Sequence, residues 1–122
     1  MLSAKPVDVK VKAVLITINK LYSSKMSSLE LYEATRGIWK LGERCKAAEY
    51  AMAVYQGIVR EVYRIDEWHD AGTSDYQTRD TREFMGSGRK EFSGLVASDI
   101  RDAYVGGFVG KSGQNPIRYV NI

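Results

Sequence analysis

The feature that most constrains the fold is a pair of strand-like segments joined by Gln56-Gly57. Residues 50–55 and 58–68 are both rich in β-branched and aromatic residues. A two-residue connection containing glycine predicts a tight antiparallel hairpin, because glycine readily takes the positive φ that such a turn needs. In the second segment, apolar residues come in two adjacent pairs, Ile58-Val59 and Val62-Tyr63, instead of alternating. This irregular period predicts a β-bulge, or a strand buried on both faces.

A helix and a strand precede the hairpin. Ser27 lies three residues before Glu30, which is the spacing of a capping box and predicts a helix from about residue 28 to residue 35. Gly37 is expected to end this helix with a positive φ. Residues 9–18 begin with alternating apolar residues and become continuously apolar. That pattern predicts a strand that enters from the surface and becomes buried.

The second half of the chain predicts further strands around a long loop. Residues 70–89 contain three glycines among many polar residues, which predicts a mobile loop. We expect a strand at 90–96 with Phe92 inward, a short helix at about 98–105 and a final strand at 117–120. These elements predict an α+β fold: a small, curved, mostly antiparallel sheet or PUA-like pseudo-barrel with one main helix and one short helix.

Composition sets the class of protein. At 122 residues, 44% hydrophobic and 27% charged, the chain is expected to form a single globular domain over residues 1–122. A single cysteine, Cys45, excludes an internal disulfide framework and is typical of a reducing compartment. No apolar run is long enough for a membrane span, and the N-terminus does not resemble a signal peptide. We therefore expect a cytoplasmic protein that does not act in a membrane.

Charge is unevenly distributed along the chain. The net charge of +3 is small, but basic residues gather in 1–28 and 79–90, on either side of an acidic segment at 60–70. This distribution would let a polyanion approach one side of the domain only. The alternative is that these charges simply keep the surface solvated.

Cations and tryptophans gather around the end of the helix and the end of the hairpin. Stacking of a base on an aromatic ring contributes about 1–3 kcal/mol, and guanidinium groups attract phosphate. We predict that two tryptophans stack on a base, cations after the helix engage phosphate, and loop arginines close over the ligand. The predicted site residues are Arg36, Trp39, Lys40, Arg44, Trp68, Arg79, Arg82 and Arg89. The open alternatives are that the tryptophans complete the core and that the loop is an exposed insertion.

An acidic pair beside the sole histidine indicates a less favoured possibility. In an extended strand Glu67 and His69 share a face while Asp66 points away, so a general base is conceivable there. One histidine argues against zinc, and we expect no metal and no other cofactor. We interpret this segment as a solvated strand end, and Cys45 as an ordinary thiol.

The order of these parts resembles the PUA-like domains, and within them the EVE and ASCH branches. The similarity lies in the Arg36-Gly37-Ile38-Trp39 turn and in the strand at residues 56–65, with residues 90–95 resembling a later strand. Members of this group bind RNA or modified bases between a barrel and its helices, which implies that Arg36, Trp39 and Lys40 line the corresponding cleft. The ASCH pattern Gly-x-Lys-x-x-Glu-x-Arg is absent.

Three functions are compatible with the sequence. The first is a non-enzymatic module that binds nucleic acid, either DNA or RNA, or a nucleotide, and recognises a modified or flipped base. The second is a small phage or mobile-element protein that binds and inhibits a host protein complex. The third is a nucleic-acid-processing enzyme that uses Glu67 and His69.

Overall fold

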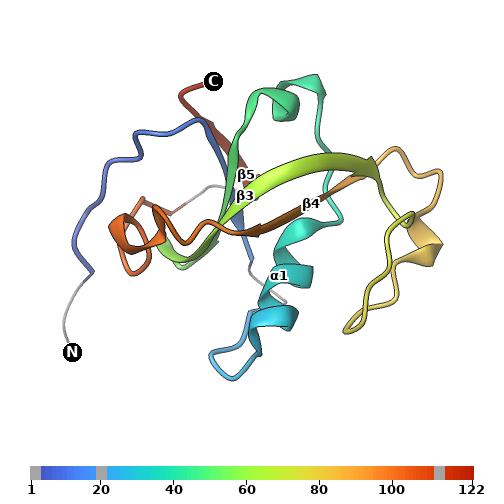
Figure 1. The fold of residues 1–122 in the computed structure, drawn as a ribbon, viewed down its shortest axis with the longest axis horizontal. Coiled ribbons are helices and arrows are strands. Elements are labelled where there is room, and N and C mark those ends of the chain that lie inside the picture. Colours follow the sequence, from blue (N-terminus) through green and yellow to red (C-terminus); the bar gives the residue numbers. More distant parts are fainter. Residues whose placement is uncertain (1–3, 19–21, 112–114) are drawn as a thin grey trace.

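In the part of the chain that the structure describes, five strands form one curved sheet in the order β4-β3-β2-β1-β5 (Figure 1). The computed structural model describes residues 4–18, 22–111 and 115–122. Strands β1 and β2 are parallel, and the other three pairings are antiparallel. The strands are β1 (Ala13–Thr17), β2 (Tyr50–Tyr55), β3 (Ile58–Asp70), β4 (Lys90–Val96) and β5 (Ile117–Val120). The predicted small α+β fold with a mostly antiparallel sheet is confirmed.

The main helix, α1 (Ser28–Arg36), begins at the predicted capping box. The Glu30 N–H donates to Ser27 Oγ at 3.1 Å, and the Ser27 N–H donates to Glu30 Oε1 at 3.0 Å. The helix ends at Gly37, but the prediction of a positive φ there is wrong, because its φ is −167°. Glycine is needed for space instead: a Cβ would lie 2.6 Å from Tyr76 Oη and 2.9 Å from Glu91 Cβ.

The predicted hairpin and its bulge are both confirmed. Gln56 and Gly57 have φ values of 52° and 79°, as a primed two-residue turn requires. The register between β2 and β3 shifts so that Arg60 has no partner. Because of this extra residue, Val59 and Val62 pack into the same part of the core although they are three residues apart.

A second register shift lies further along β3, where Asp66 has no partner in β4. The shift brings Ile65 and Trp68, also three residues apart, against the same core cluster. The sequence did not predict this second bulge.

The sheet is buried on both faces. Alternate residues of β1 belong to different core clusters, with Leu15 in one and Ile16 in the other. Helix α1 covers the Ile16 face, whereas residues 97–109 cover the Leu15 face. Burial of both faces explains why the first strand reads as a continuous apolar run. That strand is shorter than the predicted 9–18, and covers only Ala13–Thr17.

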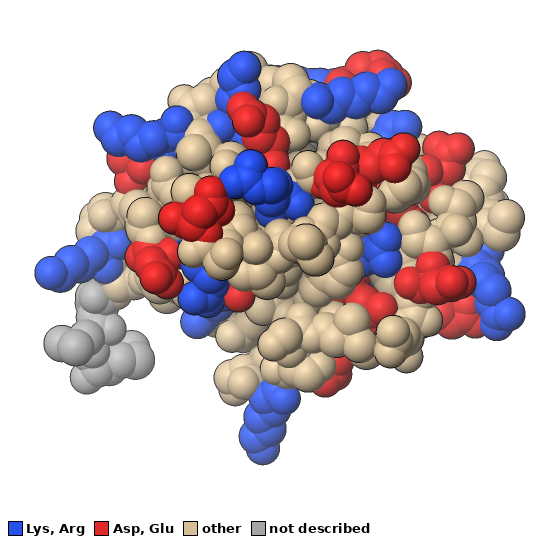
Figure 2. All heavy atoms as spheres, viewed as in Figure 1, with Lys and Arg blue, Asp and Glu red and all other residues tan. Residues whose placement is uncertain are grey.

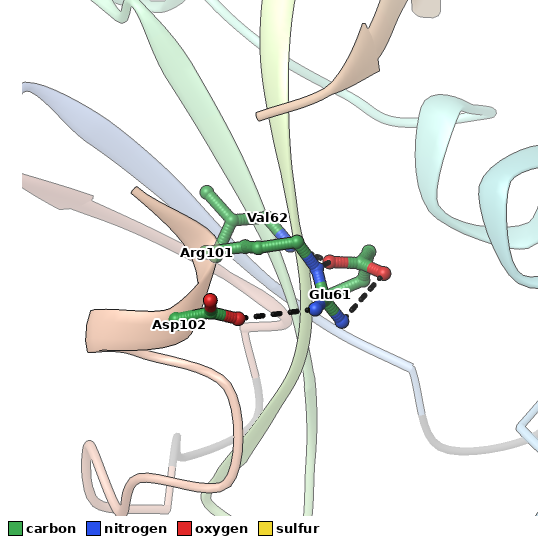
Figure 3. Close-up of polar contacts among 4 residues, drawn as sticks. All are labelled: Glu61, Val62, Arg101 and Asp102. Carbon is green, nitrogen blue, oxygen red and sulfur yellow. Dashed lines mark hydrogen bonds and ion pairs between the residues drawn. The ribbon is translucent and has the colours of Figure 1, made fainter. Parts of the chain in front are cut away.

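The predicted short helix is present only as a 3₁₀ turn, η3 (Arg101–Ala103). Gly106, with a φ of 87°, turns the chain soon after it. Arg101 fixes this turn to β3, since its Nε and one terminal nitrogen donate to the two carboxylate oxygens of Glu61 at 2.7 and 3.2 Å (Figure 3). Two further 3₁₀ turns are η1 (Glu43–Ala47) and η2 (Arg82–Phe84). Within the described ranges, no helix has the length and apolarity to cross a membrane.

Candidate functional site

The loop between β3 and β4 is fixed to α1 by a buried carboxylate. Glu33 is 2% exposed, and its side chain accepts hydrogen bonds from the backbone N–H groups of Gln77 and Thr78 at 2.8 and 2.6 Å. The Thr78 hydroxyl donates to the same carboxylate at 2.5 Å. Burial alone would raise the pKa of Glu33, but these hydrogen bonds outweigh it and lower the pKa below its ordinary value.

A second buried carboxylate, Glu91, holds the beginning of the loop. It is fully buried and accepts hydrogen bonds from the Gly72 and Ser74 N–H groups at 2.8 and 3.0 Å, and from the Tyr76 hydroxyl at 3.4 Å. Neither Glu33 nor Glu91 was among the residues predicted to form a site. No local pattern marks them, because their partners lie 15 to 45 residues away.

Arg36 is buried behind this loop. Arg36 is 6% exposed, and its Nε donates to the Phe92 carbonyl at 2.8 Å. The guanidinium carbon lies 5.2 Å from the centre of the Tyr32 ring and 4.7 Å from that of Tyr76. Together with the Tyr32 hydroxyl, which accepts from the Gly94 N–H, Arg36 covers the outer edge of β4. This placement gives Arg36 a structural role.

The three loop arginines predicted to close over a ligand have different surroundings. Arg79 donates to the backbone carbonyls of Glu33 and Gly37 at the end of α1, which leaves it partly buried. Arg82 is exposed and forms an ion pair with Asp80 at 3.0 Å, and its hydrogen bonds lower the pKa of Asp80 to about 2. Arg89 is partly buried, and its guanidinium carbon lies 5.8 Å from the centre of the Phe84 ring.

Trp39 pairs through its backbone with the first residue of β4. The Trp39 N–H donates to the Lys90 carbonyl at 3.0 Å, and the Lys90 N–H donates to the Trp39 carbonyl at 2.8 Å. The indole is partly buried against the core, and its Nε1 donates to the Thr35 carbonyl at 2.7 Å.

The turn η1 adds more positive charge to the same surface. Arg44 is exposed, donates to the Ile122 carbonyl at 2.8 Å and lies 4.8 Å from the Tyr119 ring centre. The Lys46 ammonium, and to a smaller extent Lys90, lowers the pKa of Glu43 in this turn, so β4 begins close to η1. We call this area the Trp39 surface; it consists of Trp39, Lys40, Arg44, Arg89 and Lys90.

Trp68 lies on the core side of β3. Its ring contacts Phe92 edge to face, with the ring centres 5.5 Å apart. The indole Nε1 is buried and has no hydrogen-bond partner. The ring therefore contributes to packing, and its position follows from the bulge at Asp66.

The remaining reactive side chains are held in ordinary contacts. His69 Nε2 lies 2.9 Å from Ser93 Oγ, and burial raises the pKa of the Cys45 thiol. In the part of the chain that the structure describes, no three His, Cys, Asp or Glu side chains gather as metal ligands would.

Comparison with protein-family models, with curated proteins and with solved structures gives no match for this chain. The resemblance to the PUA-like domains therefore stays a prediction.

Proposed function

We propose that the chain is a nucleic-acid or nucleotide binding module whose ligand lies on the Trp39 surface. The observation that supports this most directly is the backbone pairing of Trp39 with Lys90. It sets Lys90 beside the partly buried indole, and Lys40 and Arg89 are the chain neighbours of the two paired residues. A base stacks on an aromatic ring while neighbouring cations attract its phosphate.

The charges of this surface are available to a ligand. Among the residues described, Lys40, Arg89 and Lys90 have no carboxylate within ion-pair distance. Glu43 in η1 is paired with Lys46 at 2.6 Å, and Asp70 is the register partner of Lys90 in β3 but forms no ion pair with it. An excess of unpaired positive charge favours a polyanion, because binding releases the counterions that surround it.

The proposal retains part of the predicted site and reassigns the rest. Trp39, Lys40, Arg44 and Arg89 would contact the ligand. Arg36, Arg79 and Trp68 would not contact the ligand. They would support the site by holding the loop and the core in place. This division is compatible with a module that recognises a flipped or modified base, as the PUA-like resemblance implies.

Stacking on Trp39 can be measured directly in Trp68→Phe protein, where Trp39 is the remaining tryptophan. We expect its fluorescence to be quenched by a short oligothymidylate, an oligouridylate or a nucleoside monophosphate. Comparing these three probes also identifies the preferred class of ligand. Unchanged fluorescence with every probe at low ionic strength would contradict stacking at Trp39.

Phosphate contacts can be tested by the salt dependence of oligonucleotide binding, followed by fluorescence anisotropy. Lys40→Gln and Lys90→Gln should each weaken binding and reduce the slope of log Kobs against log salt by about 0.7, the value for one lost contact to a single strand. Lys25→Gln is the matched control, because Lys25 is exposed in the turn before α1, at the other end of that helix. An equal effect of all three changes would mean that binding is not located at the Trp39 surface.

A further inference from the structure

An apolar side chain projects from the sheet at the end of β4, away from the Trp39 surface. Leu95 is 80% exposed, and the adjacent Val96 is 43% exposed. Isolated exposed apolar residues are common, but contiguous apolar surface beside a cavity marks interaction sites.

Leu95 borders a cavity of about 400 Å³ between α1 and the sheet. Its apolar lining residues are Tyr32, Ile65 and Leu95, and Gly94 lines it as well. A Cβ at Gly94 would lie 2.1 Å from the Arg64 carbonyl oxygen, so the close approach of β4 to β3 beside the cavity depends on glycine. The cavity and the projecting leucine could together receive and contact an apolar side chain of a partner.

Carboxylates outnumber cations around this cavity: its one basic lining residue, Arg64, is paired with Asp99 at 2.8 Å. Asp66, the unpaired residue of the second bulge, lines it, and the exposed Glu67 is the register partner of a lining residue, Ser93. Glu49 is also exposed, and its carbonyl accepts the N–H of Ile65 at 2.9 Å. None of these three carboxylates forms an ion pair with a described residue. Figure 2 shows acidic side chains gathered over the carboxy-terminal half of β3.

We propose that this surface, the Leu95 surface, binds a segment of another protein that presents an apolar side chain flanked by lysine or arginine. It is defined by Leu95, the cavity beside it and the carboxylates of Asp66, Glu67 and Glu49. Complementary charge selects the partner and speeds its association. The same carboxylates repel nucleic acid, and a two-fold pairing of two copies would bring their acidic rims together.

This proposal is independent of nucleic-acid binding, because it concerns different residues. The probe is a set of peptides selected from a random phage-displayed library against the whole protein, then synthesised and measured by fluorescence anisotropy. Selected peptides should combine an aliphatic or aromatic residue with lysine or arginine. Leu95→Asp should weaken their binding at least about tenfold, as expected for a hot-spot residue.

Asp66→Lys with Glu67→Lys should weaken the same peptides and should remove much of the salt dependence of their binding. Two control variants carry equivalent changes elsewhere: Leu29→Asp on α1, where Leu29 is 39% exposed, and Glu83→Lys in η2. Both controls should bind the peptides as the unaltered protein does. Thermal melts confirm that each variant is folded, which the exposure of Leu95 leads us to expect.

Several results would overturn the proposal. Selected peptides without basic residues, or peptides that bind equally to Leu95→Asp, would exclude this surface as the docking site. A dimer in sedimentation velocity that Leu95→Asp dissociates would identify a second copy as the occupant. Loss of oligothymidylate binding in Leu95→Asp would identify nucleic acid as the occupant instead.

Discussion

Glu33 and Thr78 lie 45 residues apart in sequence, yet Glu33 Oε1 accepts hydrogen bonds from both the backbone N–H and the hydroxyl of Thr78. This contact joins α1 to the loop that leads into the Trp39 surface. Glu91 and Arg36 make further buried polar contacts with the same region. The loop that its composition predicts to be mobile is therefore held by several buried polar side chains.

Glu33→Gln should destabilise the protein by about 2 kcal/mol at neutral pH. The amide keeps the shape of the side chain, but its NH₂ group cannot accept a backbone N–H, so a hydrogen bond to a charged acceptor is lost. Urea denaturation measures the change, and limited proteolysis should cut the loop faster. Glu83→Gln, on an exposed carboxylate in η2, is the control and should change neither. A loop that is cut equally fast in both variants would mean that Glu33 does not anchor it.

Acid should remove the same contribution from the unaltered protein. The folded-state pKa of Glu33 lies below its unfolded value, so its stabilisation is present above the unfolded pKa of about 4.5 and is lost as the pH falls through both values. We therefore expect the stability difference between the unaltered protein and Glu33→Gln to shrink as the pH is lowered from 6 to about 3. Denaturation series at several pH values provide the test. A difference that stays constant over this range would contradict a depressed pKa.

Arg36→Gln should destabilise the domain by about 3 kcal/mol, because it removes a buried charged donor from the Phe92 carbonyl and from between two tyrosine rings. The control is Arg82→Gln, an exposed arginine whose loss should have little effect on stability. Chemical denaturation distinguishes the two. If Arg36→Gln melts normally but loses oligonucleotide affinity, Arg36 contacts ligand as the sequence analysis predicted.

Gly94→Ala should destabilise by about 2–3 kcal/mol, because the new Cβ would lie 2.1 Å from a backbone oxygen of the neighbouring strand. Gly42→Ala is its counterpart. A Cβ at Gly42 meets nothing within 4 Å, and its φ of −86° suits alanine, so this change should stabilise by about 0.5 kcal/mol. Thermal melts of the two variants should therefore shift in opposite directions. Equal shifts would refute the close approach at Gly94.

Trp68→Phe should change stability by less than about 1 kcal/mol. The smaller phenyl ring loses packing contacts, which lowers stability. The substitution also removes a buried N–H that has no acceptor, which raises stability and offsets part of that loss. Urea denaturation of this variant is needed before it serves as the background for Trp39 fluorescence. A loss well above that value would mean that the indole N–H has a partner in solution.

The sequence correctly predicted those structural elements that depend on interactions between residues close together in the chain. The Ser27–Glu30 capping box set the start of α1, and the Gln56-Gly57 turn set the hairpin. The paired apolar residues of the second strand correctly indicated a bulge, now located at Arg60. These predictions succeeded because each depends on residues within a few positions of one another.

Only contacts between residues far apart in sequence show that the predicted site residues have different roles. Arg36 carries the same guanidinium group as Arg82, and nothing in the sequence near them distinguishes a buried anchor from an exposed cation. Lys90 joined the candidate surface because its backbone pairs with Trp39, 51 positions earlier in the chain.

The sequence by itself determined the strands, the capped helix, the hairpin and a concentration of cations and aromatic rings around them. The tertiary structure decided which of those cations face solvent and which contacts anchor the loop. It also placed a second bulge at Asp66, which turns Trp68 toward the core. The physical reason is that burying a charged or polar side chain requires partners for its hydrogen bonds, and in this fold those partners come from segments far away in the chain.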